Sequence, residues 1–261
     1  MFPLKDNIPN ERFPLVTVAL IAINVIVYLV SIRHGGSFFG GPSGETVNHA
    51  AAIPYDFTHP GKYCEVHELV NEVGAREAEA KCADRPFPGQ IPTWETAFTA
   101  MFMHGGFLHI GGNMLFLWIF GPNVEEAMGR VRFVVFYLLG GLVALAAQIA
   151  AGPDSMVPTL GASGAIAAVL GGYIILYPRA RILSLIFIIF FVTIIEVPAL
   201  VILGFWFVEQ LLFGAAGLTT PAGGSSGVAY FAHIGGFIFG LALIRLFASH
   251  RQRQPPTSPV Y

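Results

Sequence analysis

Long apolar segments dominate this chain and limit what it can fold into. A helix needs about 20 mostly apolar residues to cross the hydrocarbon core of a bilayer. Six segments approach or reach that length, and we predict membrane spans at residues 13–32, 105–122, 131–151, 161–177, 197–214 and 228–247. Charged residues form only 11% of the sequence, whereas soluble domains carry about 25%. The predicted fold class is therefore an all-α membrane protein with a bundle of six transmembrane helices.

The apolar stretch 182–213 has two interpretations, because Glu196 and Pro198 interrupt it. It forms either two spans or one span and a shorter piece. Basic residues in short loops remain in the cytoplasm, and six spans place three arginine clusters there, together with both chain ends. These clusters are Arg130 and Arg132, Arg179 and Arg181, and Arg245, Arg251 and Arg253. Seven spans would put the last cluster outside.

The six-span topology predicts where the remaining segments lie relative to the membrane. Residues 182–195 are too short to cross, and we predict that they lie at or dip into the inner membrane face. Pro198 is expected in the first turn of the fifth helix, where proline is tolerated. Residues 214–227 are expected to form a mobile outer cover, and residues 248–261 a cytoplasmic tail.

The polar segment 34–93 is predicted to be a long extracytoplasmic loop with some helix. Both cysteines, Cys64 and Cys82, lie in it, as expected for a disulfide in an oxidising compartment. Two alternatives remain open: two free thiols, or a metal site that includes His59 and His67. The spacing matches no standard zinc pattern, so we expect no metal and no cofactor.

The net charge and the length of the chain limit which partners and which cellular compartment we expect. The formal net charge of −2 provides no basic field for a phosphate backbone, so nucleic acid is not an expected partner. The first span ends at Arg33 and lacks a small-residue cleavage site, which argues against a removable signal peptide. The absence of a transit peptide and the compact length favour a bacterial cytoplasmic membrane, with the lipid bilayer around the chain.

Ser163 is the candidate nucleophile. It lies in the sequence GASG at the start of the fourth span, which is the outer end in the six-span topology. A serine hydroxyl needs a base to become nucleophilic, and a helix N-terminus offers free N–H groups that can stabilise an oxyanion. Small residues at this spacing also serve helix packing, so the motif alone is a weak signal.

His233 is the candidate base. A histidine inside a membrane helix is costly and indicates function, although a hydrogen-bonded packing role is the alternative. Six spans start the helices of Ser163 and His233 at the same face, so the two residues share a depth. Each is followed by small residues on its helix face, which allow close approach: Ala167 and Gly171, and Gly236 and Gly240. Because no carboxylate lies at this depth, we expect a dyad.

The second span opens with three polar side chains, His104, His109 and Asn113. His109 and Asn113 are four residues apart and share a helix face, so both can aim donors at one point. Two donors beside a serine suit an oxyanion hole. The alternatives are a polar packing cluster, or a metal site with His104 that would lack a carboxylate or thiolate ligand at this depth.

At these residues the chain resembles the rhomboid family of intramembrane serine proteases, of the bacterial type. The resemblance rests on HGGFLHIGGN at 104–113, GASG at 161–164 and AHIGG at 232–236. It implies one rhomboid domain over residues 1–261, with Ser163 as nucleophile, His233 as base, and His109 and Asn113 at the oxyanion. Supporting roles are implied for His104, Gly161, Gly164 and Glu125. Many family members carry Trp-Arg where this chain has Trp94 and Glu95, which puts the contacts of that loop in doubt.

The resemblance further implies substrates that are single-span membrane proteins. Weak helix formers near the outer face would ease access to their peptide bonds, and we expect entry past the fifth span. Two other functions remain open. One is a rhomboid-like binder that recognises membrane helices without cutting them. The other is a transporter that uses the histidines as a proton path, although such proteins often carry an internal repeat that is not visible here.

Overall fold

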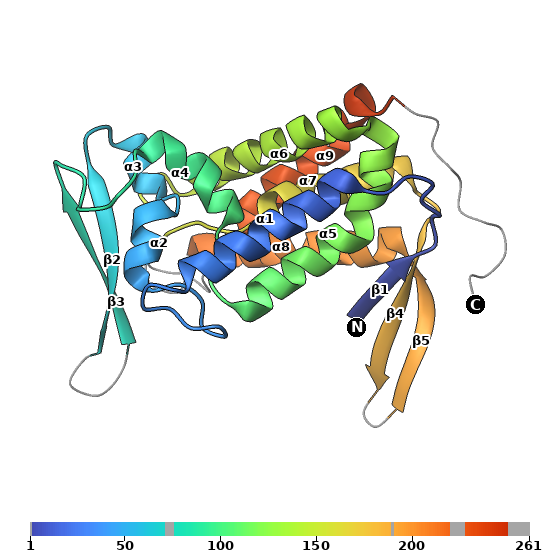
Figure 1. Ribbon diagram of the computed structural model, residues 1–261, viewed down its shortest axis with the longest axis horizontal. Helices are drawn as coiled ribbons and strands as arrows, with labels where there is room; N and C mark the ends of the chain where they lie inside the picture. Colours follow the sequence, from blue (N-terminus) through green and yellow to red (C-terminus); the bar gives the residue numbers. More distant parts are fainter. Residues whose placement is uncertain (1, 71–75, 189–190, 220–227, 250–261) are drawn as a thin grey trace.

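The structure is a computed structural model that describes residues 2–70, 76–188, 191–219 and 228–249 (Figure 1). Within these residues, six long helices form a bundle: α1 (Leu15–Ser31), α5 (Phe107–Met128), α6 (Arg130–Ala151), α7 (Ser163–Leu176), α8 (Ala199–Thr219) and α9 (Tyr230–Phe247). Each predicted span falls on one of them. Three of these helices, at Arg130–Ala151, Ala199–Leu218 and Tyr230–Phe247, are long and apolar enough to cross a membrane. This is the helical pattern of a membrane protein.

Helix α7 lies at the centre of the bundle. Its residues from Gly164 to Tyr173 are all buried, and it packs against α5, α6 and α9. With a rise of 1.5 Å per residue, its 14 residues extend for about 21 Å. This is shorter than the hydrocarbon core of about 30 Å. The first residue of α7, Ser163, can therefore lie below the surface of a bilayer that the longer helices cross.

The all-α prediction was incomplete, because the 182–195 segment forms strands. Strands β4 (Arg181–Ile188) and β5 (Phe191–Pro198) pair as an antiparallel hairpin, and β1 (Phe2–Asp6) adds to β4, giving the order β1-β4-β5. The β-branched and aromatic residues of this segment favour strands. The predicted position of Pro198 was also wrong. It ends β5 opposite Arg181, and α8 begins at Ala199.

A buried carboxylate attaches β1 to the helices. Asp6 accepts hydrogen bonds from Tyr173 Oη at 2.7 Å and from Asn123 Nδ2 at 2.6 Å. Burial raises the pKa of Asp6 to about 6, against the lowering effect of these hydrogen bonds. The sheet is therefore fixed to α5 and α7 at its base.

The segment between α1 and α5 contains strands as well as the predicted helix. It comprises α2 (Gly44–Ala50), α3 (Pro54–Thr58), β2 (Tyr63–Val70), β3 (Arg76–Ala83), α4 (Thr93–Thr99) and the short 3-10 helix η1 (Ala100–Phe102). Strands β2 and β3 form a hairpin in which Cys64 faces Cys82, and the two cysteines are joined by a disulfide. Figure 1 shows this hairpin at one end of the helices and the β1-β4-β5 sheet at the other.

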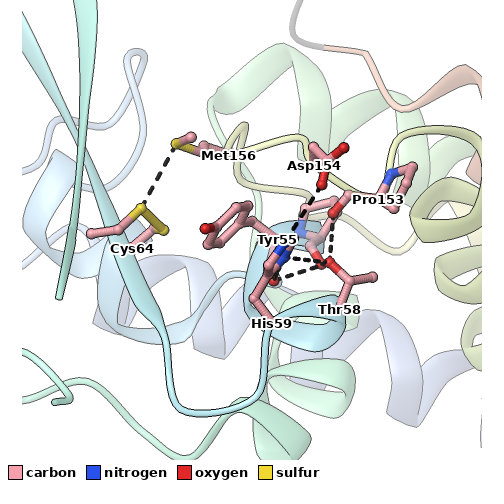
Figure 2. A network of polar contacts seen from close by, with 9 residues as sticks. Tyr55, Thr58, His59, Cys64, Pro153, Asp154 and Met156 are labelled. Atoms are coloured by element: carbon pink, nitrogen blue, oxygen red, sulfur yellow. Dashed lines mark hydrogen bonds and ion pairs between the residues drawn. A yellow bond between two sulfur atoms is a disulfide. The ribbon is translucent and has the colours of Figure 1, made fainter. Parts of the chain in front are cut away.

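Polar contacts hold the segment between α1 and α5 against the loop that precedes α7. Figure 2 shows Thr58 Oγ1 donating to the carbonyl of Pro153 at 2.7 Å, and His59 Nε2 3.7 Å from Asp154. The buried Asp56 accepts from the backbone N–H of Cys64 at 3.1 Å, and burial raises its pKa to about 6. The start of the loop that precedes α7 is thereby connected, through α3, to the disulfide hairpin.

Two predicted segments fall partly outside the described residues. The proposed outer cover at 214–227 is wrong for its first part, because residues 214–219 continue α8. Residues 220–227 lie outside the part of the chain that the structure describes, as do residues 250–261 of the proposed tail.

Glu125 joins α5 to the start of α1. Its carboxylate accepts from the backbone N–H of Val16 at 3.0 Å, and from the backbone N–H and the hydroxyl of Thr17, both at 2.8 Å. The first N–H groups of a helix have no partner within the helix. Glu125 therefore caps α1 from a neighbouring helix, with its own side chain buried.

Replacing Glu125 by alanine should lower the free energy of unfolding by about 2–3 kcal/mol, because buried N–H groups lose their acceptor. Denaturation in detergent micelles, followed by circular dichroism, measures the loss. The matched control is Glu126→Ala, since Glu126 contacts the backbone of Glu11 at the surface. Equal effects of the two substitutions would refute the capping role.

Candidate active site

Ser163 and His233 meet where two helices begin. Ser163 is the first residue of α7 and His233 the fourth of α9. The hydroxyl Oγ of Ser163 lies 2.8 Å from Nε2 of His233, in a partly buried position. This is the distance at which an imidazole can accept the proton of a serine hydroxyl as it attacks.

Glycines let the two helices approach closely enough for this contact. A Cβ atom added at Gly236 would overlap the carbonyl oxygen of Gly164, and one at Gly240 would overlap the carbonyl oxygen of Ala168. On α7, a Cβ at Gly171 would overlap the carbonyl oxygen of Phe237. The backbones of α7 and α9 are therefore in direct contact over two turns, and no larger residue fits at these positions without separating the helices.

Gln210 of α8 holds the other side of the imidazole. Its Oε1 lies 2.8 Å from Nδ1 of His233, and its side chain is buried. An amide oxygen only accepts, so Nδ1 carries the proton and Nε2 is left free to accept from Ser163. Trp206, one turn earlier on α8, packs against the ring with centroids 5.6 Å apart.

Sequence reasoning did not identify Gln210. The available signal was the polar pair Glu209 and Gln210 within an apolar stretch of α8, which is unusual in a membrane. A glutamine has no acid–base chemistry of its own, so this pair does not by itself indicate a catalytic role. Its importance depends on the position of His233, which is 23 residues away in the sequence.

His109 lies near the start of α5 beside the loop that precedes Ser163, and Asn113 follows one helical turn later on the same face of α5. The backbone N–H of Gly105 donates to Nδ1 of His109 at 3.4 Å, so the proton of the neutral ring is on Nε2. That nitrogen approaches Gly161, where an added Cβ would lie 2.8 Å from it and 3.6 Å from Ser163 Oγ. The buried Nδ2 of Asn113 finds no acceptor within the described residues. An unpaired buried donor is costly, which suggests a role with a bound group.

The loop before Ser163 is held in a fixed conformation. Gly161 has a φ of +125°, a region that residues with a side chain rarely adopt, and its N–H donates to the carbonyl of Ala100 at 2.8 Å. The N–H of Ala162 points to Nε2 of the fully buried His104 at 3.5 Å. Thr159 forms two backbone hydrogen bonds with Ala52, in the segment between α1 and α5. These contacts fix the direction in which α7 begins.

A small pocket opens beside the serine, lined by Leu160, Gly161, Ala229 and Ala232 among others. It lies at the N-terminal end of α7, where backbone N–H groups lack helical partners. Ser163 thus lies between a base with a fixed tautomer and a pocket whose lining includes neither His109 nor Asn113. Such an arrangement is suited to acyl transfer. Within the described residues, no group of three His, Cys, Asp or Glu side chains could hold a metal ion.

Replacing Gly236 by alanine should lower the free energy of unfolding by about 1–3 kcal/mol, because the new methyl group forces α7 and α9 apart. Thermal unfolding in detergent micelles measures the effect. Gly112→Ala on α5 is the matched control, since an added Cβ there meets nothing within 4 Å. A Gly236→Ala protein as stable as the Gly112→Ala protein would contradict the close helix contact.

Comparison with known proteins places this site in a family. A family model described as Rhomboid domain matches residues 92–250. Rhomboid protein 1, mitochondrial, of Saccharomyces cerevisiae is 34% identical over 146 residues, covering 54% of this chain and 38% of the yeast protein. Rhomboid protease GluP of Bacillus subtilis is 37% identical over 78 residues, 30% of this chain and 15% of that protein. Rhomboid-like protein 11, chloroplastic, of Arabidopsis thaliana is 30% identical over 167 residues, 60% of this chain and 54% of the plant protein.

The chain spans less than two thirds of the length of each of these relatives. The matched region nevertheless covers more than half of the chain and contains Ser163, His233 and the residues of α5 and α8 around them. This chain belongs to the rhomboid family.

Proposed function

We propose that this chain is an intramembrane serine endopeptidase that cuts membrane proteins in or near their transmembrane segments. The observation that supports this best is the 2.8 Å contact between Ser163 and His233, with the histidine tautomer set by Gln210. A packing role for His233 would not require a free nitrogen directed at a serine. Membership of a family that includes proteins named rhomboid proteases supports the same function.

The reaction proceeds through an acyl-enzyme. His233 Nε2 takes the proton from Ser163 as the oxygen attacks the carbonyl carbon of the substrate, and later gives it to the leaving amine. Water then attacks the acyl group, and His233 again takes and returns a proton. His109, Asn113 and the backbone N–H of Ser163 stabilise the negative charge on the carbonyl oxygen. Gln210 accepts from the N–H of the charged imidazole and keeps the ring in place.

The substrates we propose are single-span membrane proteins that enter past α8. Besides Trp206 and Gln210, Phe207 also attaches α8 to the bundle. Its ring stacks on that of Phe237 of α9, with centroids 4.4 Å apart. Large apolar side chains such as Phe205 are exposed on its other side. Movement of α8 would open the site to the bilayer, and its return would restore the contact between Gln210 and His233.

The topology is also part of the proposal. Six spans put both chain ends and the arginine clusters in the cytoplasm, and the disulfide hairpin outside. The names of the relatives include mitochondrial, chloroplastic and Bacillus proteins, so they do not favour the predicted bacterial membrane over an organelle.

A fluorophosphonate probe should label the purified protein in detergent or liposomes. Labelling should vanish in Ser163→Ala, and His233→Ala should slow it by about 10³-fold or more, because the hydroxyl loses its base. Gel fluorescence measures the rate, and Ser155→Ala, in the loop before α7, is the control. Unchanged labelling of Ser163→Ala would contradict the assignment of the nucleophile. No labelling of the unsubstituted protein would contradict the proposal and leave a binder or a transporter as the alternatives.

Gln210→Leu should slow labelling by about 5- to 150-fold, which corresponds to the 1–3 kcal/mol lost when a buried hydrogen bond is broken. Gln210→Glu should retain most of the rate, because a carboxylate oxygen also accepts from Nδ1–H. The neighbouring Glu209→Leu serves as the control on the same helix. A Gln210→Leu protein that labels as fast as the control would show that the amide does not orient His233.

A further inference from the structure

The β4–β5 hairpin has a sequence unlike that of an ordinary surface hairpin. Between Arg181 and Glu196 it contains no charged residue, and Ser184 and Thr193 are its only polar side chains. Successive side chains of a strand point to opposite faces of a sheet. Both faces of this hairpin are therefore apolar along most of its length.

Both faces are also exposed at β5. Val192 and Ile194 point to one face and are 61% and 54% exposed. Thr193 and Ile195 point to the other face and are exposed as well, Ile195 to 41%. The bundle covers the base of the sheet, where Ile182 and Ser184 are fully buried. In Figure 1 the hairpin projects from the end of the bundle, across the direction of the helices.

A protein partner would account for one apolar face, but not for two. Sheets that dock on another layer are apolar on the covered face and polar on the other. A sheet that is apolar on both faces would aggregate in water. An apolar solvent that surrounds both faces removes this difficulty, and for a membrane protein that solvent is the bilayer.

The exposed surface of the hairpin continues into a surface that faces lipid. Strand β5 ends at Pro198 and α8 begins at the next residue. Leu200 and Val201, in the first turn of α8, are exposed like Val192 and Ile194. The hairpin and a candidate membrane span are therefore consecutive in the chain, and both carry exposed apolar side chains.

The sheet edge and the charges at its base limit how deep the hairpin can lie. Within the described residues, β5 is an edge strand, and its outer backbone groups pair with no further strand. Such groups are costly in hydrocarbon. At the base, Arg181 lies 3.4 Å from Glu196, and Lys5 is on the neighbouring strand. These charges belong at the level of lipid headgroups, which leaves the apolar strands at the boundary with the acyl chains.

We propose that strands β4 and β5 form a membrane-inserted foot that lies in the cytoplasmic leaflet and contacts phospholipid on both of its faces. The foot extends sideways from the bundle, at the end opposite the disulfide hairpin (Figure 1). Because it leads directly into α8, it anchors the start of the helix that carries Gln210. The proposal concerns lipid contact and is independent of whether the chain is a protease.

Fluorescence quenching from two adjacent positions tests the foot. Val192→Cys and Thr193→Cys place one thiol on each face, and Cys64 and Cys82 do not react because they are bonded to each other. The protein carries a bimane label at one of these positions and is placed in vesicles of phosphatidylcholine and phosphatidylglycerol. We expect brominated acyl chains to quench the label strongly and iodide in the water to quench it hardly at all. The control is Asp84→Cys in the outer segment, where the carboxylate is exposed and we expect the reverse.

Three results would overturn the proposal. Lipid quenching at only one position would indicate one-sided docking on a protein. Iodide quenching at both would place the hairpin in water, and protection from both quenchers would indicate burial against a second copy. Matching thermal unfolding midpoints show that the variants fold. Ile194→Cys and Ile195→Cys, which also point to opposite faces, provide a second pair if either first variant does not fold.

Discussion

The direct contact between the backbones of α7 and α9 is the constraint on which the site depends. A hydrogen bond between a serine and a histidine on two helices requires helix axes much closer than ordinary side chains allow. Glycines at 171, 236 and 240 make that distance possible, and the hydrogen bond of 2.8 Å follows from it. Since α7 is buried on almost every side, the other helices of the bundle hold it in this position.

Helix α8 has a different role, because it is the least enclosed helix around His233. It contributes the acceptor that sets the tautomer of the base and the indole that packs on the ring. In the proposed mechanism, the same helix moves to admit substrate. Gln210 then orients His233 fully only after α8 has returned. Substrate entry would therefore be coupled to the formation of the reactive Ser163–His233 pair. The β4–β5 hairpin at the start of α8 is the natural point from which such a movement would pivot.

The sequence was sufficient for the parts of the fold that depend on apolar length. Every predicted span falls on a helix, and the small residues after Ser163 and His233 indicated which helices touch. The strands were missed because a short apolar run such as 182–195 has no periodicity that separates strand from helix. The role of Gln210 and the cap that Glu125 provides for Thr17 were missed for another reason. Each depends on a partner on a different helix, and neither residue lies in a sequence pattern that identifies its partner.

The most direct test of the central claim is cleavage in a reconstituted bilayer. A single-span substrate with glycine and proline near one end of its span is placed in liposomes with the purified protein, and fragments are identified by mass spectrometry. The account predicts a single cut near that end, made by the unsubstituted protein and absent with Ser163→Ala. Equal cleavage by both proteins, or an intact substrate with a protein that reacts with fluorophosphonate, would contradict it.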